Sequence, residues 1–157
     1  MKFVIDTGCF RQMEDYYPDV FKTFWAQFQE AVDDSEIFSV REVWLEMEQQ
    51  NKVNHVTEWA KLNKAHMFRT PVPEELAIVG QVLAVPHFSQ LIGRKQLNKG
   101  SPVADPFLIA AGKHFGATVV TTEKFAPNSA KIPNVCQHFG VESTNLQGLL
   151  KAKGWSF

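Results

Sequence analysis

Residues 104–124 read ADPFLIAAGKHFGATVVTTEK, and this stretch decides the fold class. An apolar run at 106–115 has the length of a helix and ends at a glycine, and a β-branched run follows it at 118–121. Proline is favoured in the first turn of a helix and glycine just after its last turn, so both helix ends are marked. A helix that leads at once into a short apolar strand indicates a parallel sheet.

The same alternation continues along the rest of the chain. Short strands are expected at 2–5 and 36–39, and helices at 17–32, from 39 onward, at 53–67, at 73–85 and from 144 onward. Two polar segments, 93–101 and 125–133, have the composition of loops. Strands separated by helices pair in parallel through right-handed crossovers, with helices on both faces of the sheet. We therefore predict an α/β fold, a three-layer α/β/α sandwich around a central parallel sheet, in a single domain over 1–157.

Composition narrows the range of partners. The 157 residues carry a formal net charge of −1, so binding to nucleic acid would depend on a local basic patch. No apolar run approaches the roughly 20 residues of a membrane helix, and the start MKFVID lacks the pattern of a secretory signal. The two cysteines have no CxxC spacing, which is typical of free thiols in a reducing compartment. We expect a cytoplasmic protein with no membrane partner.

Four acidic residues stand where predicted elements end or begin. Asp6 closes the first strand, Glu46 lies on the helix after the second strand, Asp105 opens the helix at 106–115, and Glu123 follows the strand at 118–121. Ligands of parallel α/β folds gather at the carboxyl ends of the strands, where these carboxylates would meet and repel one another unless a cation lies between them. Oxygen ligands suit Mg²⁺ or Mn²⁺. The pattern predicts a divalent metal site that serves phosphodiester chemistry.

Each acid also has a purely structural interpretation. Asp6 is suited to a turn in which its side chain binds local amides. Asp105 precedes a proline and is suited to capping a helix. Glu123 is suited to a turn, paired with Lys124. Glu46 is suited to a solvated helix face.

The helix that begins near Ser39 carries two candidate glutamates. Ser39 and Glu42 have the spacing of a capping box, which would turn Glu42 towards solvent. Glu46 lies nearer the apolar stripe of the helix and is the preferred metal ligand. Zinc is disfavoured because the five histidines have no HxxxH or HExxH spacing, and a phosphatase of the Rossmann type would need a second Asp two residues after Asp6.

Four segments together resemble the PIN-domain ribonucleases, the superfamily of the VapC-type toxins. They are FVIDTG at 3–8, FSVREVWLEM at 38–47, the stretch at 104–124, and KIPNVCQHFGV at 131–141. The ADPFLIAA and VVTTEK blocks, followed by IPNVC, look most like a PIN-like subfamily known as DUF4411. The resemblance extends over nearly the whole chain.

The resemblance implies a metal-dependent endoribonuclease in which Asp6, Glu46, Asp105 and Glu123 hold Mg²⁺ or Mn²⁺. It matches Thr121 to a threonine that precedes the family's fourth acid, and Thr121 is counted among the catalytic residues. It also implies the toxin of a toxin–antitoxin pair, with RNA as substrate, an antitoxin protein as partner and a homodimer.

Two departures from the family pattern leave an alternative open. Gly8 stands where Asn or Ser is frequent, and Glu123 stands where Asp is usual. The alternative is a catalytically degenerate PIN-like module that binds RNA or protein without cleavage.

Basic residues near the acids form the expected path of the RNA. Arg94, Lys95 and Lys99 precede Asp105 in one polar segment, and Lys124 follows Glu123. Lysine and arginine bind phosphates, so these four are the predicted RNA contacts. The alternative is an ordinary solvated loop.

Overall fold

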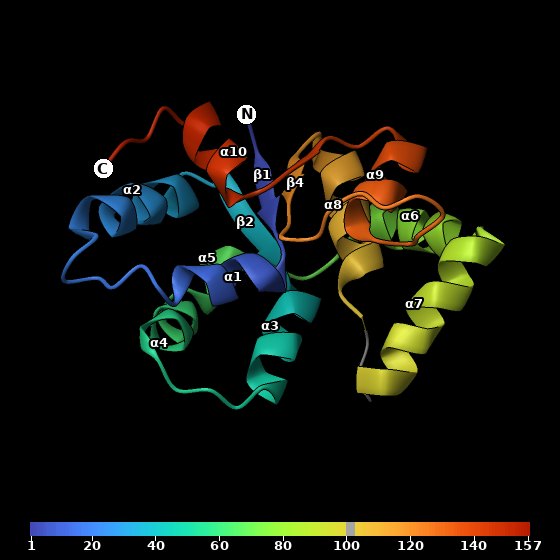
Figure 1. Ribbon diagram of the computed structural model, residues 1–157, viewed down its shortest axis with the longest axis horizontal. Helices are drawn as coiled ribbons and strands as arrows, with labels where there is room; N and C mark the ends of the chain where they lie inside the picture. Colours follow the sequence, from blue (N-terminus) through green and yellow to red (C-terminus); the bar gives the residue numbers. More distant parts are fainter. Residues whose placement is uncertain (100–102) are drawn as a thin grey trace.

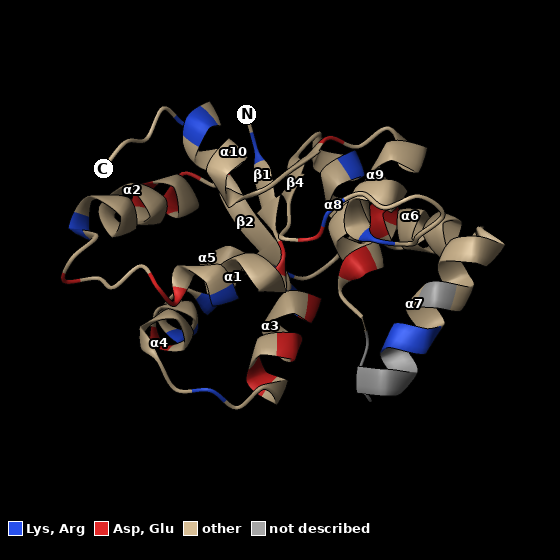
Figure 2. Cartoon of the chain, viewed as in Figure 1, with Lys and Arg blue, Asp and Glu red and all other residues tan. Residues whose placement is uncertain are grey.

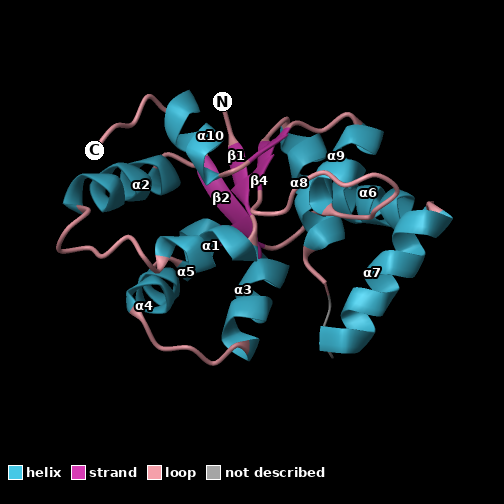
Figure 3. Ribbon diagram, viewed as in Figure 1, coloured by secondary structure: helices cyan, strands magenta, loops and turns pink. Residues whose placement is uncertain are grey.

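The computed structural model describes residues 1–99 and 103–157, with the side chains at 91 and 96–99 outside the description. These residues form a three-layer α/β/α sandwich, as predicted (Figures 1 and 3). The sheet that they contain has five parallel strands in the order β3-β2-β1-β4-β5. The strands are β1 (Phe3–Ile5), β2 (Ile37–Val40), β3 (Phe68–Arg69), β4 (Thr118–Val120) and β5 (Ser143–Thr144).

Helices cover both faces of this sheet (Figure 1). One outer layer holds α1 (Thr7–Met13), α2 (Lys22–Asp33), α4 (His55–Leu62), α5 (Lys64–Met67) and α10 (Leu146–Ala152). The other holds α6 (Pro73–Ala84), α7 (Pro86–Lys99), α8 (Asp105–Phe115) and α9 (Ile132–Phe139). Helix α3 (Arg41–Gln49) continues from the carboxyl end of β2 and extends away from the sheet.

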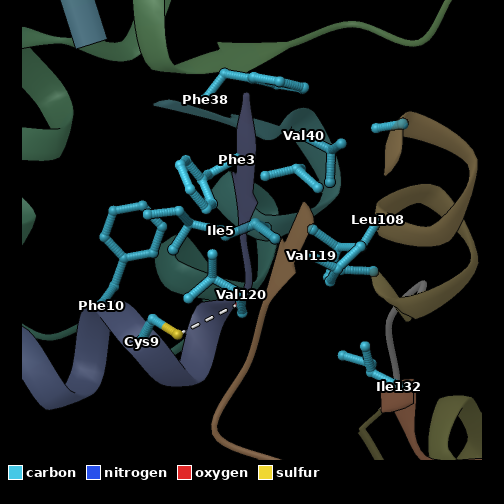
Figure 4. Packing of buried hydrophobic residues seen from close by; sticks show 14 of the residues in the cluster. Phe3, Ile5, Cys9, Phe10, Phe38, Val40, Leu108, Val119, Val120 and Ile132 are labelled. Atoms are coloured by element: carbon cyan, nitrogen blue, oxygen red, sulfur yellow. Dashed lines mark hydrogen bonds between the residues drawn. The ribbon is translucent and has the colours of Figure 1, made fainter. Parts of the chain in front are cut away.

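The core lies on both faces of the central strands. Every residue of β1 is buried, which explains why that strand is a continuous apolar run and does not alternate with polar residues. Figure 4 shows Ile5 and Val119 between side chains of the two helical layers, with Phe10 of α1 on one side and Leu108 of α8 on the other. The thiol of Cys9 donates to the carbonyl oxygen of Val120. Both cysteines are free, as predicted.

The order of the strands creates a crevice at one edge. From β1 the chain moves outward to β2 and β3, and it then returns to β4 on the other side of β1. The segments that follow β1 and β4 therefore leave towards opposite faces of the sheet. Parallel α/β folds bind ligands outside the carboxyl ends of the strands at such a point.

Several predicted elements differ from the observed ones. Residues 93–101 were expected to be a loop, but α7 runs as a helix to Lys99. Its buried Phe88 and Ile92 lie one turn apart, while the polar sequence that follows Ile92 resembles a loop. The helix expected at 53–67 is divided into α4 and α5. The elements α1, β3, α9 and β5 were missed, because the two strands have only two residues each and neither helix begins with the sequence of a capping box.

The predicted capping box at Ser39 is also wrong. Helix α3 has Val40 as its N-cap, and the Ser39 hydroxyl donates to the carbonyl oxygen of Ile5 on the neighbouring strand. Glu42 is not turned to solvent: it is only 3% exposed and is bound by Arg41 at 2.8 Å. The Ser39 hydroxyl thus forms its hydrogen bond within the sheet and does not cap the helix.

Within the described residues, no single helix is long and apolar enough to cross a membrane, although α6 and the first part of α7, bent by 92° where they meet, together pass that test of length and composition.

Candidate functional site

A cavity of about 600 Å³ opens at the crevice beside β1 and β4. All four predicted acids line it, although they come from four separate parts of the chain. Figure 2 shows acidic positions on α3 and at the start of α8 on either side of this edge of the sheet. The lining residues are Asp6, Thr7, Gly8, Arg11, Glu46, Gln49, Gln50, Lys95, Asp105, Thr122 and Glu123.

Asp6 is fixed by two hydrogen bonds at the end of β1. Its Oδ1 accepts from the Thr7 amide at 2.7 Å, and its Oδ2 accepts from the Thr121 hydroxyl at 3.0 Å. Asp6 binds a local amide, as its structural interpretation proposed, but it does so as the N-cap of α1, and it still lines the cavity. Burial, followed by the charges of Asp105 and Glu123, raises the pKa of Asp6 to about 7. The two hydrogen bonds oppose this rise.

Thr121 positions Asp6 and does not line the cavity itself. It is buried, and its hydroxyl oxygen also accepts from the Glu123 amide at 3.1 Å. One hydroxyl thus connects the acid after β1 to the backbone of the acid after β4.

Glu46 connects three elements at the cavity wall. Its Oε1 accepts from the Ala104 amide at 3.1 Å, and its Oε2 accepts from the Thr7 hydroxyl at 2.6 Å. The carboxylate of α3 is therefore anchored to the start of α8 and to α1. The structure places Glu46 in the cavity, while Glu42 is not among its lining residues.

Asp105 and Glu123 both form an ion pair with Lys95. The Lys95 Nζ lies 2.8 Å from Asp105 Oδ2 and 3.2 Å from Glu123 Oε1. Burial raises the pKa of Asp105, although Lys95 opposes this rise. Burial alone would lower the pKa of Lys95, but the two carboxylates outweigh it and raise that pKa. Asp105 is not the helix cap that its structural interpretation suggested, because Ala104 occupies that position without a side-chain bond.

Glu123 reaches a second partner at the start of α9. Its Oε2 accepts from the Ile132 amide at 2.7 Å, and Ile132 is the first residue of that helix. Amide groups at a helix start favour a negative charge. Glutamate is one methylene longer than aspartate, which helps its two oxygens to contact Lys95 and α9 at once. These two contacts explain why glutamate, rather than aspartate, suits position 123.

The departure at Gly8 also has a local cause. A Cβ atom at this position would lie 2.3 Å from the Thr122 hydroxyl oxygen. Thr122 therefore occupies the space that a side chain at position 8 would need, and Thr122 itself lines the cavity.

The predicted RNA contacts have separate positions. Lys95 lines the cavity, whereas Arg94 and Lys124 are exposed and are not among its lining residues. The side chain of Lys99 lies outside the described residues. One basic residue of the cavity was missed: Arg11, on α1. It lies four residues after Thr7, so helical spacing would have placed both on one face had α1 been recognised.

The donor set has the chemistry that a hard cation prefers, because it consists of carboxylate and hydroxyl oxygens. Among the residues that the structure describes, no three His, Cys, Asp or Glu side chains are grouped closely enough to hold a metal ion. In this conformation the Lys95 ammonium lies between two of the four carboxylates.

Comparison with known proteins supports a family assignment. No curated protein matches the chain. The family model described as "Domain of unknown function (DUF4411)" matches residues 3–157, which confirms the narrower of the two resemblances. The chain therefore belongs to the DUF4411 family.

Proposed function

We propose that the protein is a PIN-type endoribonuclease that depends on Mg²⁺ or Mn²⁺. The observation that carries this proposal is the meeting of Asp6, Glu46, Asp105 and Glu123 in one cavity at the carboxyl edge of a parallel sheet. Burial raises the pKa of Asp6, and the negative charges of Asp105 and Glu123 raise it further. A site that gathers such groups is suited to a divalent cation, and hydrolysis of phosphodiester bonds is a common use of that cation.

Asp6, Glu46, Asp105 and Glu123 would hold the metal. When bound, Mg²⁺ or Mn²⁺ supplies a Lewis acid that favours ionised water and neutralises phosphate charge. The chain's own groups keep the carboxylates in place, namely the hydroxyls of Thr7 and Thr121 and the amides of Ala104 and Ile132. Fixed ligands reduce the reorganisation needed during the reaction.

The substrate would contact the basic residues in and around the cavity. Arg11 lines the cavity and would bind a phosphate oxygen near the acids, and Arg94 and Lys124 outside the cavity would be further contacts. In-line attack of water on phosphorus would leave a 5′-phosphate and a 3′-hydroxyl. The proposal includes a cytoplasmic toxin of a toxin–antitoxin pair that forms a homodimer and is held inactive by an antitoxin.

A specific observation favours a second candidate function. Lys95 already neutralises two of the four acids, as expected for a degenerate module that binds RNA or protein without cutting it. Calorimetric titration with Mn²⁺ separates the candidates, because a module that only binds has no need to hold the metal.

Cleavage assays on two variants test the nuclease proposal. Asp6→Asn and Asp105→Asn should each reduce Mn²⁺-dependent cleavage of a single-stranded RNA on the order of 10²-fold or more, since each loses a charged ligand. Asp19→Asn, at an exposed turn, is the matched control and should cleave normally. Circular dichroism confirms that each variant is folded. Wild-type activity in either folded variant would overturn the proposal.

A further inference from the structure

The positively charged side chain of Lys95 lies in the cavity and contacts two of its acids. Lys95 extends from α7, a helix of the outer layer, and its Nζ contacts Asp105 at 2.8 Å and Glu123 at 3.2 Å. Its side chain is 33% exposed, while those of Asp105 and Glu123 are 9% and 28% exposed. The ammonium therefore reaches from the rim into the acidic side of the cavity.

The contacts of Lys95 use the same oxygens that a metal would need. An ammonium group donates up to three hydrogen bonds and requires acceptors close to it, as a divalent cation requires oxygen ligands. A dication at Asp105 and Glu123 would also repel the lysine charge at short range. The two cations therefore exclude each other at these carboxylates.

We propose that Lys95 is a built-in competitor of the divalent metal, which holds Asp105 and Glu123 together in the metal-free protein and leaves them when the metal binds. This inference rests on the proposed function, because it takes the cavity as the metal site. It goes further by assigning control of metal affinity to a residue that is not a ligand.

The surroundings of Lys95 allow this exchange. Lysine carries its charge on a flexible stem of four carbons, and the partial exposure of Lys95 gives the ammonium a route to water by side-chain rotation. After its release the ammonium remains at the rim of the cavity. There it is available to a phosphate oxygen of the substrate, which would couple metal loading to substrate binding.

Titration of Mn²⁺ into the full-length protein by calorimetry tests the competition. Lys95→Met removes the charge and keeps the length of the side chain, so the variant should bind Mn²⁺ about three- to tenfold more tightly than the wild type. This factor corresponds to the loss of two partly exposed ion pairs that compete with the metal. Lys95→Gln, which remains polar, should change in the same direction. Lys151→Met is the matched control: it removes an exposed lysine charge on α10, which contributes no residue to the cavity lining, and its Mn²⁺ affinity should equal that of the wild type.

Thermal unfolding supplies a second measurement. In EDTA, Lys95→Met should melt at a lower temperature than the wild type, because its two acids lose their cation. Saturating Mn²⁺ should raise its melting temperature by more than it raises that of the wild type. A lysine that serves only as a structural ion pair would lower stability equally with and without Mn²⁺.

The outcomes distinguish this inference from the proposed function. If the wild type binds Mn²⁺ and cleaves RNA but both Lys95 variants bind no more tightly, the competition is refuted and the nuclease stands. If only the Lys95 variants bind Mn²⁺, the competition is supported and the wild type is not a metal-dependent nuclease. If none of the proteins binds Mn²⁺, the competition is refuted, because removing the lysine opens no site.

Discussion

Replacing Asp6 by asparagine should stabilise the metal-free protein above neutral pH. The reason is the buried charge, because Asp6 is only 8% exposed and lies near the charges of Asp105 and Glu123. Asparagine has nearly the same shape. Its oxygen can accept from the Thr7 amide, and its NH₂ group can donate to the Thr121 oxygen in place of the bond that Thr121 now donates.

The size of the effect follows from the pKa. Burial and the neighbouring charges raise the pKa of Asp6 from the ordinary 3.8 to about 7. One pH unit corresponds to about 1.4 kcal/mol, so the ceiling is about 4 kcal/mol. Water in the cavity and the titration of neighbouring acids reduce this ceiling, and we expect Asp6→Asn to gain about 2 kcal/mol at pH 8.

The raised pKa of Asp6 also determines how the free energy of unfolding changes with pH. Between pH 4 and 7 the folded protein keeps a proton on Asp6 that the unfolded chain has released. The free energy of unfolding of the wild type should therefore fall as pH rises through this range, and level off above about pH 7. Asp6→Asn lacks this contribution, so the two proteins should have similar stability near pH 4 and diverge towards pH 8.

Urea unfolding in EDTA at several pH values from 4 to 8.5 measures the effect. Asp19→Asn, which removes an exposed carboxylate, is the control and should follow the wild type. The reasoning is refuted if Asp6→Asn is no more stable than the wild type at pH 8, or if its unfolding free energy falls with pH as steeply as that of the wild type.

Three further predictions concern helix packing, phosphate binding and the loop after Glu123. Gly112→Ala should destabilise the protein by about 1–3 kcal/mol in urea unfolding, because the new Cβ would lie within 3 Å of two valine methyl groups. The control Gly80→Ala meets no atom within 4 Å and should be neutral or stabilising by up to about 1 kcal/mol. Equal effects of the two substitutions would contradict the packing argument. Arg11→Ala should weaken binding of an uncleavable RNA and lower the slope of log affinity against log salt by about 1, and an unchanged slope would remove Arg11 from the phosphate path. Asn134→Ala loses three hydrogen bonds that hold the loop after Glu123, so limited proteolysis should cut that loop faster in the variant than in the wild type. An unchanged rate of proteolysis would show that other contacts hold the loop.

Much of the fold is encoded in local sequence. The continuous apolar run of β1 and the buried stripe of α2 predicted a strand and a helix because strands and helices have distinct periodicities. The strands β3 and β5 have two residues each, too few for a period. They are strands because the edges of β2 and β4 offer them hydrogen bonds, and only the assembled sheet provides those edges.

The acids of the cavity were likewise found from their places at element ends, where Asp6 and Glu123 follow β1 and β4. Their partners were not predictable in this way. Lys95 was expected in a loop that binds RNA, and folding instead places it on α7 against two acids. Sequence by itself determined which residues are apolar, acidic and close to a strand end, because these properties are local. Tertiary structure alone decided which charge meets which, because those contacts join segments that only the packing of the helical layers on the sheet brings within bonding distance.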